Sequence, residues 1–344
     1  MQNINPSADR ITLAHGAGGR KTSELIHDLF ARHFASPHLT SDDAAILPIV
    51  GTPIAMTTDG FIVSPWRFPG GNIGKLSICG TVNDLACMGA TPRYLTCAFQ
   101  IEEGFPLADL DTIAAAMAAT AAKAGVQIVA GDTKVAGKGQ VDGLFITTTG
   151  IGERLPGIAT SGAFARPGDD ILVSGDIGRH GAAILLARGD YGIAADITSD
   201  CAPLAEPILH ALRATGGRCA DVHTIRDATR GGVGTVLHEI AEESHVGIEI
   251  NAPNLPIDPA VAGLTSLLGL SPLYLACEGR VIIICRPEAT DGILHALAQH
   301  DDTKGAKRIG TVTDTHVGHV MLQTEIGTQV LLPEPTGELL PRIC

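Results

Sequence analysis

A chain of 344 residues is long enough to form two domains, each with a hydrophobic core. Its composition, 45% hydrophobic and 18% charged, is typical of a folded globular protein and excludes a largely disordered one. The formal net charge of −13 argues against a nucleic-acid-binding protein, because such proteins neutralise phosphates with basic side chains. Carboxylates in excess can still bind phosphates where divalent metal ions bridge the two.

The cysteines and the apolar runs narrow the class of protein further. The eight cysteines form no C-x-x-C pair, so a zinc site is not expected, and most lie within apolar runs typical of small buried side chains. Residues 1–10 are polar, unlike a signal peptide, and no apolar run approaches the ~20 residues of a membrane span. We therefore predict a cytoplasmic protein that enters no membrane and binds no nucleic acid.

Hydrophobic periodicity in the first half of the chain predicts helices and strands in alternation. The expected helices cover residues 22–34, 72–90 and 107–124, and the expected strands cover residues 53–58, 93–101, 126–130 and 144–151. The segment 126–130 is a short, mostly apolar run of the kind found in buried strands.

Three acidic residues in this half are candidate ligands for a metal ion. Asp43 precedes an apolar pair and is either such a ligand or part of a solvated turn. Asp59 follows the strand 53–58 and precedes a glycine, a suitable position for a metal ligand. Asp84 lies within the apolar pattern of the helix 72–90, where an unpaired carboxylate is costly to bury. It needs a partner or a metal ion, and we favour the metal over a role in a cap or turn.

The segment Gly131-Asp132-Thr133-Lys134 follows the strand 126–130 and combines groups that bind phosphates. The acid can hold a metal ion, the hydroxyl and the backbone can donate hydrogen bonds, and the lysine can neutralise oxygen charge. The alternative is an ordinary polar turn.

The composition changes around residues 153–169, where prolines, glycines and charged residues gather. We divide the chain into an N-terminal segment 1–36, an N-terminal domain 37–155, which the resemblance described below makes the ATP-binding and dimerisation domain, an α+β domain 156–332 and a tail 333–344. In the third of these, strands are expected at 171–174, 222–226, 279–285, 308–313 and 328–332, and helices at 181–188, 203–215, 232–244 and 287–299. Asp227 and Thr229 occupy one strand-to-helix passage, where exposed helix N–H groups favour anions.

The last residues, Pro341-Arg342-Ile343-Cys344, place a thiol at the end of the sequence. The residues before them include Pro333, Pro335 and Gly337, which cannot continue a helix or a central strand. Fully extended, this tail spans about 40 Å, enough to carry a sulfur atom into a cleft. The alternative is a frayed end with an incidental cysteine.

Five acids at expected element junctions, in a chain without a Walker A loop, suggest a phosphate site with several metal ions. The order SDDAA, TTDG, GTVND, GDTKV and DATRGG also resembles the superfamily of aminoimidazole ribonucleotide synthetase, thiamin-monophosphate kinase and selenophosphate synthetase. Within that superfamily, the segments FPGGNIGK, CGTVND and the final PRIC resemble the HypE family of hydrogenase maturation proteins. The likeness extends over nearly the whole chain.

The resemblance implies a two-domain α+β fold of the aminoimidazole ribonucleotide synthetase type. Its N-terminal sheet would dimerise into a barrel-like core, and a site for ATP and Mg²⁺ would lie between the domains. By motif, the magnesium ligands would be Asp43, Asp59, Asp84, Asp132 and Asp227. The same acids, with Lys75, Asn83, Thr133 and Thr229, would contact the nucleotide, and Lys134 would contact the nucleotide or the reacting group. Glu278 follows Cys277, where the family usually has asparagine.

Proteins of this family are carbamoyl dehydratases. The resemblance implies that a HypF-type carbamoyltransferase loads a carboxamide onto Cys344 and that ATP phosphorylates the amide oxygen. Loss of phosphate leaves a thiocyanate, and its cyanide passes through a HypC–HypD-type complex to the iron of a [NiFe]-hydrogenase. In this chemistry Glu278 is the expected general base, and Lys134 the expected stabiliser of charge.

Two other functions stay open at this point. A selenophosphate synthetase-like kinase would need a reactive cysteine near the N-terminus, and none precedes Cys79. A dimeric assembly scaffold without enzymatic activity would offer the tail to partners, and would not hydrolyse ATP in response to a carbamoylated tail.

Overall fold

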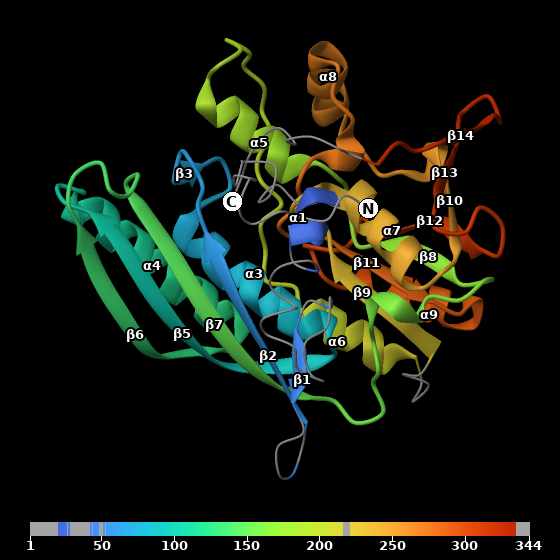
Figure 1. The fold of residues 1–344 in the computed structure, drawn as a ribbon, viewed down its shortest axis with the longest axis horizontal. Coiled ribbons are helices and arrows are strands. Elements are labelled where there is room, and N and C mark those ends of the chain that lie inside the picture. The colour runs from blue at the N-terminus through green and yellow to red at the C-terminus, as the bar shows by residue number, and fades with distance from the viewer. Residues whose placement is uncertain are drawn as a thin grey trace.

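The helix α3, Ile73–Cys87, lies at the centre of the computed structural model, between two sheets (Figure 1). The structure describes residues 20–25, 27, 42, 44–47, 51, 53–215 and 221–334. The side chain of Asn72 caps α3 by accepting the N–H of Lys75 at 3.0 Å. Of the 15 residues of α3, all but Lys75 are buried, as expected for a helix that is apolar around its whole circumference.

A five-stranded sheet packs on one side of α3. Its order is β1-β2-β7-β5-β6, and all neighbours are antiparallel except β5 and β6. The strands are β1 (Ala45–Leu47), β2 (Ile54–Phe61), β5 (Ala90–Glu102), β6 (Gln127–Ala136) and β7 (Leu144–Arg154). The helix α4, Leu107–Ala124, connects the parallel pair β5 and β6 and packs beside α3. We call this unit the N-lobe.

A seven-stranded sheet forms the second unit, the C-lobe. Its order is β14-β13-β10-β12-β8-β11-β9, and all neighbours are antiparallel except β10 and β13. The strands are β8 (Asp170–Val173), β9 (Val222–Asp227), β10 (Gly247–Asn251), β11 (Val281–Cys285), β12 (Lys307–Thr313), β13 (Val320–Gln323) and β14 (Gln329–Leu331). The helices are α5 (Arg179–Arg188), α6 (Ala205–Ala214), α7 (Gly232–Glu243), α8 (Pro259–Leu268) and α9 (Pro287–Leu297).

Short elements complete the described chain. They are the helix α1 (Arg20–Leu25), the hairpin β3–β4 (Arg67–Phe68 and Gly71–Asn72) and the 3₁₀ turns Gly162–Phe164, Ala252–Asn254 and Pro272–Tyr274. No helix within the described ranges is long and apolar enough to cross a membrane.

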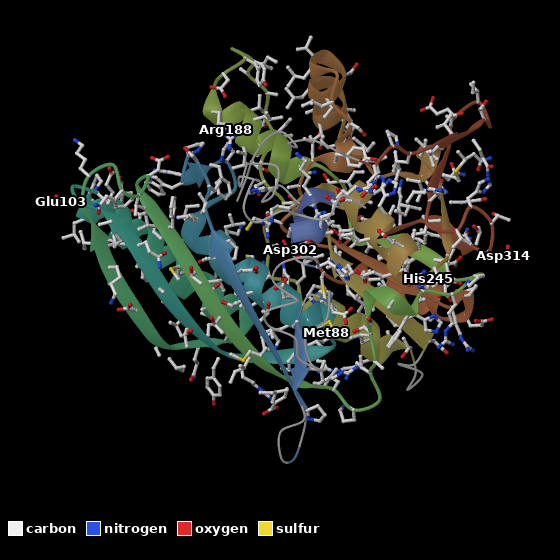
Figure 2. All side chains as sticks on the ribbon, viewed as in Figure 1. Met88, Glu103, Arg188, His245, Asp302 and Asp314 are labelled. Atoms are coloured by element: carbon white, nitrogen blue, oxygen red, sulfur yellow. The ribbon has the colours of Figure 1, made fainter. Side chains whose placement is uncertain are left out.

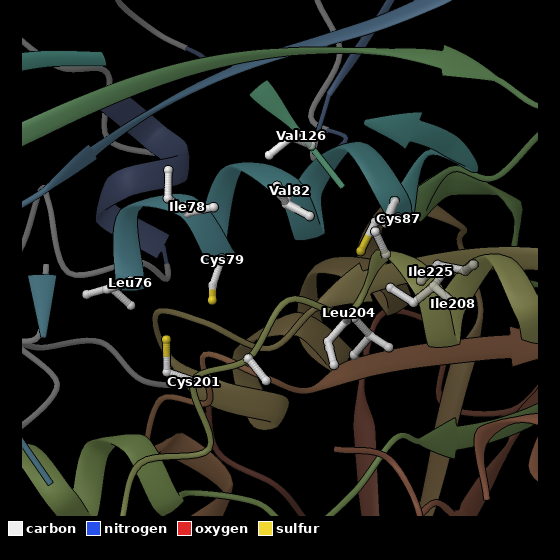
Figure 3. Packing of buried hydrophobic residues seen from close by; sticks show 14 of the residues in the cluster. Leu76, Ile78, Cys79, Val82, Cys87, Val126, Cys201, Leu204, Ile208 and Ile225 are labelled. Carbon is white, nitrogen blue, oxygen red and sulfur yellow. The ribbon is translucent and has the colours of Figure 1, made fainter. Parts of the chain in front are cut away.

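The hydrophobic core is continuous between the lobes. In β11, residues 281, 283 and 285 belong to the same cluster as α3, α6 and α9, whereas residues 282 and 284 join a second cluster with α7. Figure 3 shows Leu204, Ile208 and Ile225 of the C-lobe near the face of α3 that carries Cys87. Lys123 also pairs with Asp302 at 2.8 Å, and Arg188 donates to the Ser64 carbonyl at 2.9 Å. Figure 2 labels the two C-lobe residues of these contacts, Arg188 and Asp302.

The structure corrects two of the expected strands. Residues 127–130 belong to a ten-residue strand, β6, which lies at the sheet edge and is exposed rather than buried: Val129 is 57% exposed. The sequence prediction was wrong because an apolar run does not reveal whether a layer covers it. Likewise β2 continues through Asp59 to Phe61, so Asp59 lies within the strand instead of after it. The strands β10 and β13 and the helix α8 were not predicted from the sequence.

Candidate active site

Two acids of the N-lobe meet at the sheet-to-helix contact. Asp84 lies one turn before the end of α3, and Asp59 lies on the face of β2 that packs against this helix. Their carboxyl groups lie close enough to interact, and Thr57 Oγ1 donates to Asp84 Oδ2 at 2.8 Å. Burial raises the pKa of Asp59, and the nearby guanidinium of Arg230 opposes this rise. Two carboxyl groups in contact need either a shared proton or a cation.

The C-lobe contributes the passage from β9 to α7. Asp227 ends β9, and Thr229 and Arg230 follow before the helix begins at Gly232. Gly232 has φ of +61°, and a Cβ there would lie 2.5 Å from the carbonyl oxygen of Leu275. The passage is therefore held closely against the segment that leads to Glu278.

Glu278 lies immediately before β11 and is only 4% exposed. Its pKa is raised well above the usual value, first by burial and then by the negative charges around it, among them Asp227, Asp200 and Asp59. The site thus contains acids from both lobes. A buried carboxyl with a raised pKa in such a cluster is suited to exchange protons near neutral pH.

Cys277 has a structural role in this loop. Its backbone N–H donates to the Ala228 carbonyl at 3.0 Å, and its Sγ accepts the N–H of Gly178 at 3.1 Å. Burial raises the pKa of this thiol well above the usual value, so Cys277 is not a nucleophile near neutral pH.

The acid pair of the N-lobe fits a magnesium ion. Within the described residues, no three His, Cys, Asp or Glu side chains are already placed as a complete metal cluster. Magnesium does not require such a cluster, since it is usually held by one or two carboxylates, waters and substrate phosphates. Asp59 and Asp84, in contact and partly desolvated, offer that kind of carboxylate pair.

The structure does not bring Asp132 and Lys134 to this cluster. Across neighbouring strands, Asp59 pairs with Thr148, Thr148 with Cys97, and Cys97 with Gly131. These four residues therefore lie on the face of the sheet that packs on α3. Because side chains alternate along a strand, Asp132 and Lys134 lie on the opposite face, three strands or about 14 Å from β2. There they pair with each other at 2.8 Å, and the hydrogen bond from Lys134 lowers the pKa of Asp132. Thr133 lies on the α3 face of the same exposed edge strand.

Asn83 and Lys75 bind parts of the protein itself. The Asn83 amide accepts the N–H of Leu204 at 2.7 Å and donates to the carbonyls of Ala202 and Glu278 at 3.1 and 3.4 Å. Its hydrogen-bonding groups therefore have partners within the protein, and its contact with a nucleotide stays a prediction. Lys75 Nζ donates to the Gly70 carbonyl at 2.9 Å, beside a cavity of about 660 Å³ lined by residues 67–72 and Thr112.

Two expected site residues, Asp43 and Cys344, lie outside the described residues. The neighbouring Asp42 is described, and its Oδ1 accepts the hydroxyl of Ser161 and the N–H of Gly162, each at 2.8 Å. Sequence reasoning missed Arg230 and Asp200. Arg230 could have been found as a basic residue next to Asp227, whereas the sequence around Asp200 carries no such signal.

Two family models match the chain. Residues 41–154 match "AIR synthase related protein, N-terminal domain", and residues 166–323 match the C-terminal domain of the same family. Carbamoyl dehydratase HypE of Cupriavidus necator is 44% identical over 343 residues, covering 99% of this chain and 97% of the relative. The chain belongs to the HypE family. The resemblance and the fold class stated from the sequence are thereby confirmed.

Solved HypE structures agree with this assignment. One described as HypE in complex with ATP has a TM-score of 0.81 at 44% identity, covering 97% of this chain and all of that one. Another, from a HypE–HypF complex, has a TM-score of 0.85 at 43% identity, covering 90% of this chain and 99% of that one.

Proposed function

We propose that this HypE-family chain is a carbamoyl dehydratase, which uses ATP to convert a carboxamide on Cys344 into a thiocyanate. The observation that carries the proposal is the buried Glu278 at the contact between the lobes, facing the charges of Asp59 and Asp227. This arrangement offers both groups that the reaction needs, namely anionic ligands for a metal–nucleotide complex and a base. The activity named for the relative in Cupriavidus necator supports the same reading.

Acids of both lobes bind ATP through magnesium in this proposal. Asp59, Asp84 and Asp227 would hold the ion, which screens the charge on the transferring phosphoryl group when bound. Arg230, which interacts with the Asp59 carboxylate, supplies a further positive charge beside the phosphates. Thr229, at the start of the passage into α7, is placed to donate to a phosphate oxygen.

Glu278 acts as the general base. The carboxamide oxygen leaves as phosphate once the γ-phosphoryl group of ATP is bonded to it, and the nitrogen loses both protons as the carbon–nitrogen triple bond forms. One of these protons passes to Glu278 and then to solvent and the other leaves on the phosphate, so the products are the thiocyanate, ADP, hydrogen phosphate and one proton, and atoms and charge balance. The raised pKa of Glu278 lets it take up such a proton near neutral pH.

A second copy of the chain completes the molecule as a homodimer. The outer face of the N-lobe sheet leaves Met56 and Tyr94 exposed by 41% and 47%, which is typical of a covered apolar face. Asp132 and Lys134 lie on this same face. Packing of two sheets through it would bring Lys134 of one protomer towards the other protomer, where it can stabilise charge on the reacting group.

The partners expected from the resemblance remain part of the proposal. A HypF-type carbamoyltransferase loads Cys344, and a HypC–HypD-type complex receives the cyanide for the iron of a [NiFe]-hydrogenase. A solved relative in complex with HypF supports the first of these partners.

Intact mass of the full-length protein tests the function. After incubation with the carbamoyl-transfer system, ATP and magnesium, we expect Cys344 to carry first a carboxamide and then a thiocyanate. Cys344→Ala should bind ATP as the wild type does and form neither. Glu278→Gln should stop at the carboxamide or its phosphorylated form, with the dehydration slowed about 10²–10⁴-fold.

The alternatives give different results in the same experiment. A scaffold would acquire the carboxamide but would hydrolyse no ATP in response. A kinase for a small molecule would hydrolyse ATP equally well with Cys344→Ala. Either result would contradict the proposed function.

A further inference from the structure

The peptide group between Glu278 and Gly279 is held at both of its ends. Its carbonyl accepts the amide of Asn83 at 3.4 Å, and its N–H donates to Asp200 Oδ2 at 3.1 Å. Asn83 belongs to α3 in the N-lobe, whereas Asp200 belongs to the segment before α6 in the C-lobe. The backbone of Glu278 is therefore fixed between the two lobes.

The approach of Asp200 to this peptide is very close. A Cβ on Gly279 would lie 2.0 Å from the main-chain oxygen of Asp200, so only glycine permits the contact. The Asp200 side chain is fully buried, and its Oδ1 has no hydrogen-bond partner among the described residues. A carboxyl group buried in this way is costly, and Arg280 lies 4.0 Å away as a weak partner. The direct hydrogen-bond partner of the Asp200 carboxylate is the Glu278–Gly279 peptide.

Asn83 connects the same region to the metal-binding acids. Its amide also binds Ala202 and Leu204, so that one side chain fixes the 202–204 segment and Glu278 together. Its neighbour in α3 is Asp84, which interacts with Asp59. One turn of α3 thus sets the distance between the acid pair and Glu278.

On the other side of Gly279, Arg280 secures the next peptide. Its guanidinium donates to the Gly279 carbonyl at 2.7 Å and to the Asp302 carbonyl at 3.0 Å, and it pairs with Asp176. The Arg280 carbonyl accepts the N–H of Ala228, next to Asp227. These contacts leave the backbone that carries Glu278 little freedom to move.

We propose that Asn83 and Asp200 are positioning residues for Glu278, which hold its backbone in a fixed position relative to the Asp59–Asp84 pair. This inference rests on the proposed function. It assigns Asn83 to the alignment of the base instead of to the nucleotide, and it gives the buried Asp200 a role in the dehydration step. A base displaced by about 1 Å can lose about 10²-fold in rate.

The test compares Asp200→Ala and Asn83→Ala with wild type, using full-length protein already loaded with the carboxamide. The rate of thiocyanate formation at saturating ATP is measured by intact mass, and ATP affinity by calorimetry. We expect both variants to lose about 10²-fold in rate with ATP affinity unchanged. Asp200→Asn keeps an oxygen that can accept the Gly279 N–H, and we expect it to retain most of the rate.

Thr160→Val is the matched control. Thr160 Oγ1 donates to the Cys87 carbonyl at 2.8 Å, so this substitution also removes a buried hydrogen bond at the contact between the lobes. It has no connection to Glu278, and its rate should equal that of the wild type. Hydrogen exchange of the Gly279 amide gives a second measurement, independent of activity, and should be faster in Asp200→Ala but not in Thr160→Val.

The outcomes separate the inference from the proposed function. If Asn83→Ala loses ATP affinity but keeps its rate at saturation, Asn83 binds the nucleotide and the inference is wrong. The inference also fails if both alanine variants turn over like the wild type while Glu278→Gln stalls. If the wild type forms no thiocyanate, the proposed function is wrong and the positioning role falls with it.

Discussion

Asp84 illustrates how one residue joins sequence and structure. A carboxylate inside an apolar helix had to find a partner, and in the fold it meets Asp59 and Thr57. Its nearest polar neighbours are thus another acid and a hydroxyl, an arrangement that favours a bound cation. The acid pair is the part of the site that the proposed function assigns to magnesium.

Asp84→Asn should abolish magnesium-dependent ATP binding, because the substitution removes an anionic ligand and keeps the shape of the side chain. Calorimetric titration with and without magnesium measures this loss. Asp111→Asn, on the exposed face of α4, changes the net charge equally and should bind as the wild type does. Unchanged affinity in Asp84→Asn would remove this residue from the site.

Glu278 is expected to reduce stability at high pH. The pKa of Glu278 is raised in the folded protein. Its contribution to the free energy of unfolding is therefore fully present below the pKa that Glu278 has in the unfolded chain, and is lost as pH rises through its pKa in the folded protein. The loss is about 1.4 kcal/mol for each pH unit of this window. Glu278→Gln lacks this titration, and its melting temperature should exceed that of the wild type at pH 8.

The difference between Glu278→Gln and wild type should shrink as the pH falls towards 5, and thermal melting across that range measures it. Glu325→Gln, at an exposed position, should show no such trend. A constant difference at all pH values would mean that Glu278 is not titrating in the folded protein.

At the scale of elements, α3 depends on close packing against its neighbours. Gly74, in its first turn, faces α4, and a Cβ there would lie 2.3 Å from the main-chain oxygen of Ile113. The two helices can approach this closely because Gly74 has no side chain. The contact fixes α4 and, through it, the edge strand β6 that follows.

Gly74→Ala should destabilise the protein by about 1–3 kcal/mol, because α3 and α4 must separate. Gly263→Ala is the matched control, since this glycine also lies in a helix, α8, and a Cβ there meets nothing within 4 Å. It should gain roughly 0.5–1 kcal/mol from the better helix propensity of alanine. Denaturant unfolding measures both, and equal effects would contradict the packing argument.

At the scale of the whole molecule, the position of Lys134 has a consequence for the proposed dimer. It lies on the outer face of the N-lobe sheet, away from Asp59 and Asp84. If two copies pair through this face, each site takes its base from one protomer and its lysine from the other.

Mixing Glu278→Gln with Lys134→Ala should then restore activity, although each variant alone is inactive. Random exchange makes about half of the dimers mixed, each with one intact site, so about a quarter of wild-type thiocyanate formation is expected. Intact mass after exchange of subunits measures it, and sedimentation confirms that dimers form. No recovery, with exchange demonstrated, would show that Lys134 does not act across the dimer.

The sequence alone determined the family, the two-lobe α+β fold and the order of most elements. Helix 107–124 was predicted with its exact ends, because an alanine-rich amphipathic segment followed by glycine has a clear start and stop. The motifs around Asp84 and Asp227 indicated acids of one site. Asp84 is a carboxylate within an apolar run and Asp227 is a carboxylate at a strand end, and both features can be recognised in the sequence.

Only the tertiary structure decided which of these residues meet. Strand pairing put Asp59 on the α3 face and Asp132 on the opposite one, and a period of two residues cannot show which face is covered. The packing of the lobes gave Asn83 its partners in Ala202, Leu204 and Glu278, all more than a hundred residues away in the chain. It also buried Asp200 against Gly279. Such contacts depend on how the two lobes pack together, which no local pattern of residues records.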